Sequence, residues 1–305
     1  MIMKERCEPL ELKIYKCLST RMDLDPIDTN HFNNLVKGYH GEKMFDDWLK
    51  ASMSGVLVLN DLLLQTNNSI FQIDSLFLTS QKIYLFEVKN YEGDFFIEGE
   101  KWFSASKLEI KNPILQLKRN ESLFRRLLQE MKFSFPVEAY VVFLNPEFHL
   151  YQAPPTLPIV YPSQLNRFAE KLKINNLTSK GVHSKLAEKL LSLHVDESPY
   201  SRLPEYRYEE VVKGIVCMGC GKFNLSLYKK NILLCNYCNG TEIYKDAVLR
   251  TVNEFKLLFP NKKITTDQID DWCGNMKNKR SIQRILRENF IRVGHGKTTK
   301  YVDVR

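Results

Sequence analysis

The sequence contains no long hydrophobic run. No stretch approaches the ~20 apolar residues of a membrane-spanning helix, and the first residues lack the uninterrupted apolar segment of a signal peptide. The chain also contains no internal repeat and no low-complexity tract. These absences argue against a membrane partner and against secretion, so we expect a cytoplasmic protein in a reducing compartment.

The composition is that of an ordinary globular protein. Hydrophobic residues make up 44% of the chain and charged residues 26%, so a hydrophobic core is expected. With 305 residues, the chain exceeds a typical domain of roughly 100–200 residues, and we expect more than one domain. Nothing in the sequence indicates an oligomeric state.

Four of the seven cysteines form two closely spaced pairs, Cys217-x-x-Cys220 and Cys235-x-x-Cys238. In a reducing compartment such pairs indicate a metal site rather than a disulfide framework. Two such turns, each with a glycine shortly after its second cysteine, present four thiolates in the closed tetrahedral arrangement of a structural Zn²⁺ site. The residues between the turns read as two strands, and the segment resembles a zinc ribbon. An iron–sulfur cluster or a redox-active cysteine pair remains an alternative.

The net charge of +8 is unevenly distributed. Residues 245–305 hold 14 Lys and Arg against 7 Asp and Glu, a net charge of +7. This asymmetry suggests a nucleic-acid partner for that end of the chain, although a solvated basic surface would have the same composition.

The same C-terminal segment reads as three helices followed by a hairpin with Gly294-His295-Gly296 at its tip. It resembles a winged helix, in which the third helix enters the major groove and the wing contacts the backbone. A winged helix that contacts protein instead is the alternative. The residues expected to bind nucleic acid are Lys279, Arg280, Arg284, Arg287, Arg292, Lys297 and Lys300.

Charged residues interrupt an apolar hairpin near residue 80. The sequence from Ile70 to Val88 reads as two strands joined by a short polar turn, with Asp74 on the first arm and Glu87 on the second. Side chains alternate between faces along a strand, so Glu87 and Lys89 point the same way. Such charges are costly to bury unless they bind something.

Two carboxylates on adjacent strands can hold Mg²⁺, which prefers oxygen ligands. A lysine beside them can act on a metal-bound water or on a phosphate, and these are the groups that hydrolysis of a nucleic-acid backbone requires. Taken alone, the pattern also fits the exposed edge of a hairpin.

Four segments in chain order resemble the nuclease-related domain (NERD) family, a branch of the PD-(D/E)XK nuclease-like fold. They look like the family's Gly-x-x-Gly-Glu helix, its metal-binding Asp strand, its Glu-x-Lys-Asn-x-x-Gly signature and its Asn-Pro-x-x-Gln helix start. The resemblance covers roughly residues 31–150. The segments are Lys37-Gly38-Tyr39-His40-Gly41-Glu42, Gln72-Ile73-Asp74, Phe86-Glu87-Val88-Lys89-Asn90-Tyr91-Glu92-Gly93 and Asn112-Pro113-Ile114-Leu115-Gln116.

The resemblance implies roles for five residues. Asp74 and Glu87 would bind Mg²⁺ (or Mn²⁺), and Lys89 would position the nucleophilic water. Glu42 would reach the metal or its water shell from the first helix. Gln116 would orient Lys89, a water or a phosphate.

The expected fold class is α/β (α+β): a restriction-endonuclease-like mixed sheet flanked by helices, followed by a small four-cysteine zinc ribbon and a winged-helix-like domain. Within the first domain, a helix capped by Thr29 or Asn30 is expected to be interrupted at Gly38 and Gly41, which mark a turn or a close backbone approach. The expected boundaries are 1–30 for an N-terminal helical extension, 31–195 for the nuclease-related domain, 196–210 for a linker, 211–244 for the zinc ribbon and 245–305 for the winged-helix-like domain.

These features together predict a Mg²⁺-dependent nuclease whose C-terminal modules supply affinity for the phosphate backbone of DNA. The alternative is a regulatory or scaffolding protein that binds DNA and keeps a nuclease fold without turnover. Binding or processing of RNA is a third possibility, because basic charge does not distinguish the two polymers. The presence of Asp74, Glu87 and Lys89 favours the enzyme.

Overall fold

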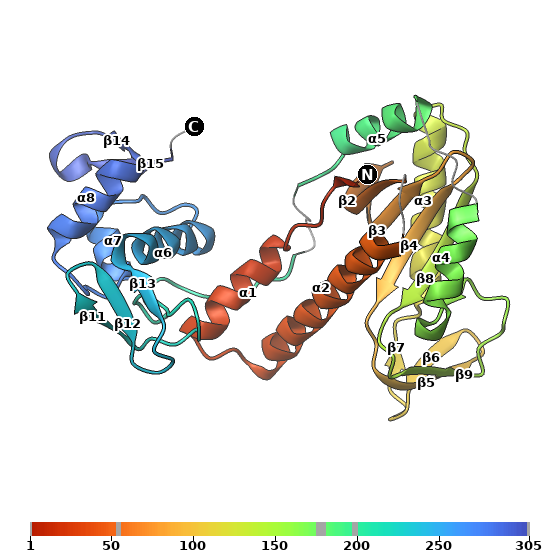
Figure 1. Cartoon of the computed structure of the whole chain (residues 1–305), viewed down its shortest axis with the longest axis horizontal. Coiled ribbons are helices and arrows are strands. Elements are labelled where there is room, and N and C mark those ends of the chain that lie inside the picture. Colours follow the sequence, from red (N-terminus) through yellow and green to blue (C-terminus); the bar gives the residue numbers. More distant parts are fainter. Residues whose placement is uncertain (1, 53–55, 175–180, 197–200, 304–305) are drawn as a thin grey trace. The chain divides into compact units, whose positions relative to one another are not determined.

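The computed structural model describes residues 2–52, 56–174, 181–196 and 201–303. The chain divides into two compact units (Figure 1). The described residues contain eight α-helices and both parallel and antiparallel strand pairs, so the expected mixed α/β class is confirmed. None of these helices combines the length and the apolar character that a membrane span needs. The first unit comprises Met1–Pro9 and Asn33–Ser201, and the second comprises Leu10–Phe32 and Arg202–Arg305.

A six-stranded sheet forms the centre of the first unit. The β2–β3 and β3–β4 pairs are antiparallel, whereas β1–β2, β4–β8 and β8–β10 are parallel. The predicted apolar hairpin is therefore the middle of a mixed sheet. In spatial order the strands are β1 (Ile2–Lys4), β2 (Leu57–Thr66), β3 (Ser69–Leu78), β4 (Ile83–Lys89), β8 (Val137–Phe143) and β10 (Ile159–Val160).

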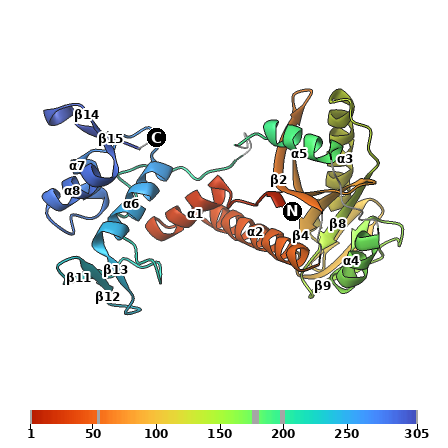
Figure 2. The ribbon, with the colours of Figure 1, turned by 45° about the horizontal axis from the view of Figure 1, so that its top comes forward.

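Helices cover both faces of this sheet (Figures 1 and 2). On β4, Ile83 and Leu85 pack in the core beneath α3 and α5, whereas Tyr84 and Phe86 pack in the core beneath α2 and α4. Because both faces are buried, the strand reads as a near-continuous apolar run. Glu87 continues the series of Ile83 and Leu85 and so lies on the face that α3 covers. The helices are α2 (Pro26–Ser52), α3 (Pro113–Glu130), α4 (Leu165–Ile174, after a 3₁₀ turn at Pro162–Gln164) and α5 (Val182–Ser192).

A second sheet of the first unit has four strands. Its β5–β6 pair is antiparallel and places Ile97 opposite Trp102, whose side chain is buried. Strands β5 and β6 thus form a hairpin outside the central sheet. In spatial order the strands are β7 (Glu109–Ile110), β6 (Lys101–Ser104), β5 (Gly93–Glu98) and β9 (Phe148–Tyr151).

Helix α2 differs from the helix that the sequence predicts. It begins at Pro26, upstream of the expected caps, and it runs without interruption through Gly38 and Gly41. Proline is favoured at the first helical position, where an N–H would have no partner. Asp25 Oδ1 accepts a hydrogen bond from the N–H of Asp28 at 2.7 Å, as an N-cap residue does. The expected caps were wrong, because Asp25 and Pro26 start the helix earlier in the chain. The expected interruptions were also wrong, because the low helix propensity of two glycines is not enough to break a long helix.

Residues from the N-terminal and the C-terminal parts of the chain both contribute to the hydrophobic core of the second unit. Ile14 and Leu18 pack in the same core as Val252 and Trp272. Tyr208, in the segment expected to be a linker, is also buried in it; residues 197–200 of that segment lie outside the described residues. The elements are α1 (Leu10–Arg21), β11 (Leu225–Lys229), β12 (Ile232–Cys235), β13 (Thr241–Ile243), α6 (Tyr244–Leu258), α7 (Thr266–Trp272), α8 (Lys279–Asn289), β14 (Ile291–Val293), a 3₁₀ turn (Gly296–Thr298) and β15 (Lys300–Val302).

The C-terminal part of the second unit has the element order that the sequence predicts, three helices and then an antiparallel strand pair. Thr265 caps α7, and its hydroxyl accepts a hydrogen bond from the N–H of Gln268. An isolated bridge between Ile264 and Tyr301 adds a further strand-like contact beside β15. The assignment of this module as a winged helix stays a prediction.

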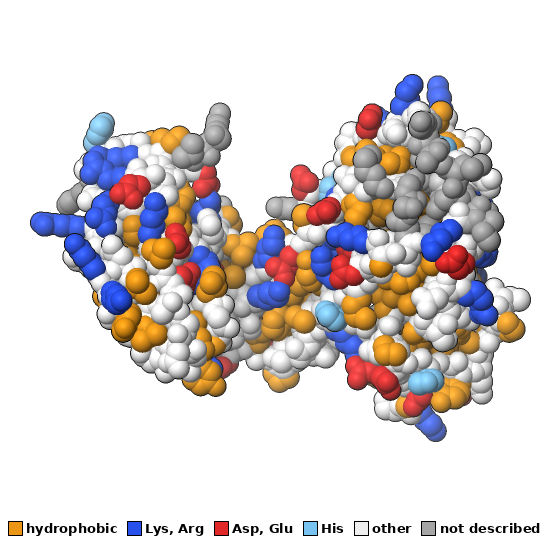
Figure 3. Space-filling model, viewed as in Figure 1, with side chains coloured by type: hydrophobic (Ala, Val, Ile, Leu, Met, Phe, Trp, Pro, Cys, Tyr) orange, Lys and Arg blue, Asp and Glu red, His pale blue; other side chains and the backbone are white. Residues whose placement is uncertain are grey.

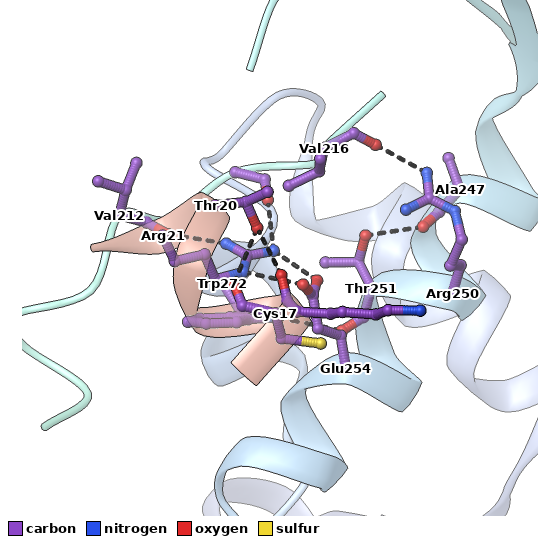
Figure 4. Close-up of polar contacts among 12 residues, drawn as sticks. Cys17, Thr20, Arg21, Val212, Val216, Ala247, Arg250, Thr251, Glu254 and Trp272 are labelled. Atoms are coloured by element: carbon purple, nitrogen blue, oxygen red, sulfur yellow. Dashed lines mark hydrogen bonds and ion pairs between the residues drawn. The ribbon is translucent and has the colours of Figure 1, made fainter. Parts of the chain in front are cut away.

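Arg21, the last residue of α1, is a buried charged residue that makes several polar contacts within the second unit (Figure 4). Its side chain is fully buried, and its guanidinium bonds both carboxylate oxygens of Glu254 at 3.1 and 2.5 Å. It also donates to the carbonyl oxygen of Val212 at 2.7 Å and lies 4.1 Å from the ring centroid of Trp272. One side chain thereby ties α1 to α6, to α7 and to the segment before the first cysteine pair.

Replacement of Arg21 by methionine is expected to destabilise the second unit by about 3–5 kcal/mol, because it leaves the Glu254 carboxylate without its buried partner. Denaturant unfolding followed by tryptophan fluorescence measures this change. The pair of Arg202 with Asp28, 3.4 Å apart, is the matched control, because the Arg202 side chain is 55% exposed. Arg202→Met should cost about 1 kcal/mol or less. Equal effects of the two substitutions would contradict this assignment.

Candidate active site and metal centre

Asp74 lies where β3 and β4 part. The register that pairs Ser75 with Phe86 places Asp74 opposite Glu87. Asp74 Oδ2 accepts a hydrogen bond from the backbone N–H of Val88 at 2.7 Å, and both carboxylates are buried. The hairpin therefore brings together the two acidic residues that the sequence singles out.

Lys89 and Gln116 both bind the Glu87 carboxylate. Lys89 Nζ donates to Glu87 Oε1 at 2.7 Å and to Gln116 Oε1 at 3.3 Å. Gln116 Nε2 donates to the same oxygen of Glu87. These three residues, all expected at the site, form one hydrogen-bonded cluster between β4 and α3.

The start of α3 holds Gln116 in this position. Asn112 is the N-cap, and its side chain accepts a hydrogen bond from the N–H of Ile114 at 2.9 Å. Pro113 occupies the first turn, where proline is favoured. The Asn-Pro pair thus fixes where the helix begins, and Gln116 follows within the first turn.

Asn120 joins the cluster and was not predicted from the sequence. It is buried, and its Nδ2 donates to the carbonyl oxygen of Gln72 at 2.9 Å and to Glu87 Oε2 at 3.4 Å. Asn120 follows Gln116 by one helical turn, so the two side chains share a face of α3. That spacing is the signal from which it could have been found.

Glu42 enters from α2 and is held by Arg6, a second residue that was not predicted. Arg6 Nη1 donates to Glu42 Oε2 at 2.7 Å. Its Nε and Nη2 donate to the Asp46 carboxylate at 3.1 and 3.3 Å, and Nη2 also donates to the carbonyl oxygen of Asp74 at 2.7 Å. No periodic pattern marks Arg6, because its partners are far away in the sequence.

Gly41 lets α2 approach the end of β4. A Cβ atom at this position would lie 2.5 Å from Cβ of Asn90, closer than real Cβ atoms approach. Asn90 Nδ2 also donates to the carbonyl oxygen of Lys37 at 3.0 Å. The expectation of a close backbone approach is therefore correct for Gly41, whereas a Cβ at Gly38 would meet nothing within 4 Å. The close packing at Gly41 brings the next residue, Glu42, toward the sheet.

Burial raises the pKa of three carboxyl groups at the site, those of Glu42, Asp74 and Glu87. It raises the pKa of Glu42 to about 8 and that of Glu87 to about 7, and the charge of Asp74 adds to both shifts. Burial also raises the pKa of Asp74. For Lys89, burial acts to lower the pKa, but the charges of Glu87 and Asp74 outweigh it and the pKa is raised. Asp74 thus repels both glutamates, and a hard divalent cation, which prefers oxygen ligands, would offset this repulsion.

The four paired cysteines converge on one point. The Sγ atoms of Cys217 and Cys238 are 3.7 Å apart, those of Cys220 and Cys235 are 3.6 Å apart, and all four lie within 4.8 Å of one another. A disulfide needs sulfurs about 2.05 Å apart, whereas a tetrahedron with Zn–S bonds of about 2.3 Å has edges of about 3.8 Å. Within the described ranges, no other group of Cys, His, Asp or Glu brings three ligand atoms this close together. The expected four-cysteine cluster is confirmed, and its geometry fits zinc.

The two cysteine turns are built alike, with one difference between them. The N–H of Gly221 bonds the carbonyl of Cys217, and the N–H of Asn239 bonds the carbonyl of Cys235, both at 2.9 Å. Gly221 has φ +69° and Asn239 has φ +59°, in the left-handed region. In the second turn the left-handed residue is Asn239 and not the glycine that follows it, because asparagine also tolerates this conformation. A third strand, β13, completes the small sheet of β11 and β12.

Helix α8 presents its basic residues to solvent. Its apolar residues Ile282, Ile285 and Leu286 are buried, and Lys and Arg side chains gather over this end of the second unit (Figure 3). The side chain of Lys297 lies outside the described residues. Exposed are Lys279, Arg280, Arg284 and Arg287 on α8 and Arg292 on β14, whereas Lys300 on β15 is half-buried.

Two of these basic residues have anionic neighbours. Lys279 lies 2.9 Å from Asp267, and Arg284 lies 4.0 Å from Glu288. For Arg280 and Arg287, no ion pair occurs among the residues that the structure describes. Among the basic residues of α8, these two are therefore the most available to an anionic partner.

Residues 37–144 match the family model described as nuclease-related domain. The chain therefore contains a nuclease-related domain, and the resemblance seen in the sequence is confirmed. The match covers about a third of the chain and includes Glu42, Asp74, Glu87 and Gln116, but it excludes Arg6. No curated protein and no solved structure matches the chain.

Proposed function

We propose that the nuclease-related domain is a metal-dependent nuclease that hydrolyses phosphodiester bonds of nucleic acid, with DNA as the preferred substrate. The observation that supports this most directly is the convergence of buried carboxylates with a lysine. Asp74 and Glu87 meet from adjacent strands, and Lys89 Nζ lies 2.7 Å from Glu87 Oε1. These are the groups that such a reaction needs.

In this proposal each side chain has a separate task. Asp74 and Glu87 hold Mg²⁺ or Mn²⁺, which when bound activates water and offsets the charge of the phosphate. Lys89 keeps its positive charge because its pKa is raised, and it orients the attacking water or the phosphate. Gln116 fixes the Lys89 ammonium beside Glu87, and Glu42 reaches the metal or its water shell.

A cleavage assay on plasmid and single-stranded DNA, with Mg²⁺ or Mn²⁺ and with EDTA as the control, tests the proposal. We expect cleavage that needs the metal and stops with EDTA. If no substrate is cut while DNA still binds in a salt-sensitive way, the chain is a DNA-binding protein with a nuclease fold.

The four cysteines are proposed to hold a structural Zn²⁺ ion. All four ligand positions are sulfur, so none is open to a substrate, as a catalytic zinc site would require. The proposed role of the zinc is to stabilise the β11–β13 module.

The exposed face of α8 is proposed to contact the phosphate backbone of DNA. Replacing both Arg280 and Arg287 by glutamine should weaken binding and reduce the slope of log K against log salt by about 0.9 for each phosphate that the variant no longer neutralises. Fluorescence anisotropy across a salt series measures this. Arg207, which is 80% exposed and lies outside α8, is the matched control. An unchanged slope in the double variant would rule out this face.

A further inference from the structure

The N-terminal residues of the chain lie outside the matched domain, yet they belong to its compact unit. Residues Ile2–Lys4 form β1, which pairs in parallel with β2 at the edge of the central sheet. Arg6 follows this strand, and its side chain is 1% exposed. The strand thus places a buried guanidinium between α2 and β3.

The contacts of Arg6 leave it no role as a substrate-binding residue. Its Nε, Nη1 and Nη2 atoms all donate to protein oxygens, on Glu42, Asp46 and the backbone of Asp74. A guanidinium that is buried and already bonded in three directions cannot reach a phosphate in solvent. Arg6 can therefore act only on the groups that it bonds, which are Glu42, Asp46 and the backbone of Asp74.

The two carboxylate oxygens of Glu42 differ in their hydrogen bonding. Oε2 accepts the hydrogen bond from Arg6 at 2.7 Å, whereas Oε1 has no hydrogen-bond partner among the described residues. The same guanidinium binds the Asp74 backbone at 2.7 Å, so one rigid planar group fixes Glu42 relative to Asp74. Asp46, one turn after Glu42 on α2, orients the guanidinium from its other edge.

We propose that Arg6 is a positioning residue of the candidate metal site: it fixes the Glu42 carboxylate beside Asp74 so that the remaining oxygen of Glu42 is directed at the divalent ion or its water shell. This inference rests on the metal site of the proposed function and extends that site to the N-terminal segment. A lysine could not replace Arg6, because a single ammonium lacks the planar fork that reaches three partners.

Calorimetric titration of the zinc-loaded full chain with Mn²⁺ tests the inference without relying on cleavage. Outer residues that orient a metal ligand typically change metal affinity by about 10- to 100-fold when they are replaced. Arg6→Lys, which keeps the charge, should weaken Mn²⁺ binding by that factor. In a Glu42→Gln background the same substitution should have no further effect, because Arg6 acts through Glu42.

Arg21→Lys is the matched control, since it alters a buried arginine that bonds Glu254 in the second unit and leaves every contact of Arg6 in place. It should lower the melting temperature with less than a threefold change in Mn²⁺ affinity. If Arg6→Lys does not fold, Glu42→Asp tests the same contact, because it withdraws the carboxylate from Arg6 by one methylene and should weaken Mn²⁺ binding by about tenfold.

Two results would overturn the inference and leave the metal site standing. One is a folded Arg6→Lys variant with parental Mn²⁺ affinity, and the other is an equal loss of affinity in the parental and Glu42→Gln backgrounds, which indicates a purely structural role. A parent that binds no Mn²⁺ overturns the inference together with the metal site. A parent that binds Mn²⁺ in an Arg6-dependent way but cuts no DNA overturns the nuclease proposal alone.

Discussion

Replacement of Lys89 by alanine is expected to abolish metal-dependent cleavage while DNA affinity stays at the parental value. The Lys89 ammonium is the cation bonded to Glu87, and no other positive group within the described residues bonds this carboxylate. Loss of a group that stabilises developing charge or moves a proton typically costs about 10²–10⁴-fold in rate. We expect a loss of about 10³-fold or more in the single-turnover rate.

The control for this experiment is Lys82→Ala. Lys82 lies just before β4 and pairs with Glu138 at 2.6 Å, away from the carboxylate cluster. Its replacement should leave the rate unchanged. Glu87→Ala should abolish cleavage as Lys89→Ala does, but it should also weaken Mn²⁺ binding, since Glu87 is a proposed ligand. Cleavage by Lys89→Ala at the parental rate would show that the assigned catalytic role is wrong.

Removal of zinc is expected to unfold the β11–β13 module and leave the nuclease-related domain folded. The module has little apolar core. Leu233 is fully buried, but the large side chains of Met218, Tyr228 and Tyr237 are 70%, 59% and 61% exposed. A structural zinc site typically contributes about 10–16 kcal/mol of apparent binding free energy to folding. Without the metal, nothing of comparable size holds the two cysteine turns together.

Metal analysis and hydrogen exchange measure this result. We expect one zinc per chain, and a rise in exchange over β11, β12 and β13 after chelation or in Cys235→Ser. Exchange in the central sheet of the first unit should stay unchanged. Cys7, which is exposed, provides the control variant Cys7→Ser. A chain that carries iron and absorbs visible light would support an iron–sulfur cluster instead.

The sequence by itself determined those features that depend on short spacings. Alternation along β4 put Glu87 and Lys89 on one face, and the Asn112-Pro113 pair set the start of α3 and with it the place of Gln116. The cysteine spacing likewise defined the four-cysteine cluster. In each case the chain geometry over a few residues is regular, so the pattern is enough.

Only the tertiary structure decided which distant residues complete the site. Arg6 meets Glu42 and Asp74 because β1 joins the edge of the sheet, and Asn120 meets Glu87 because α3 crosses the end of β4. It also decided that α1 packs in the core of the C-terminal unit, through contacts such as that of Arg21 with Glu254. These contacts join residues far apart in the chain, and their energy arises only when the packed elements meet. The helical spacing from Gln116 places Asn120 on the same face of α3, but it does not show which strand that face meets.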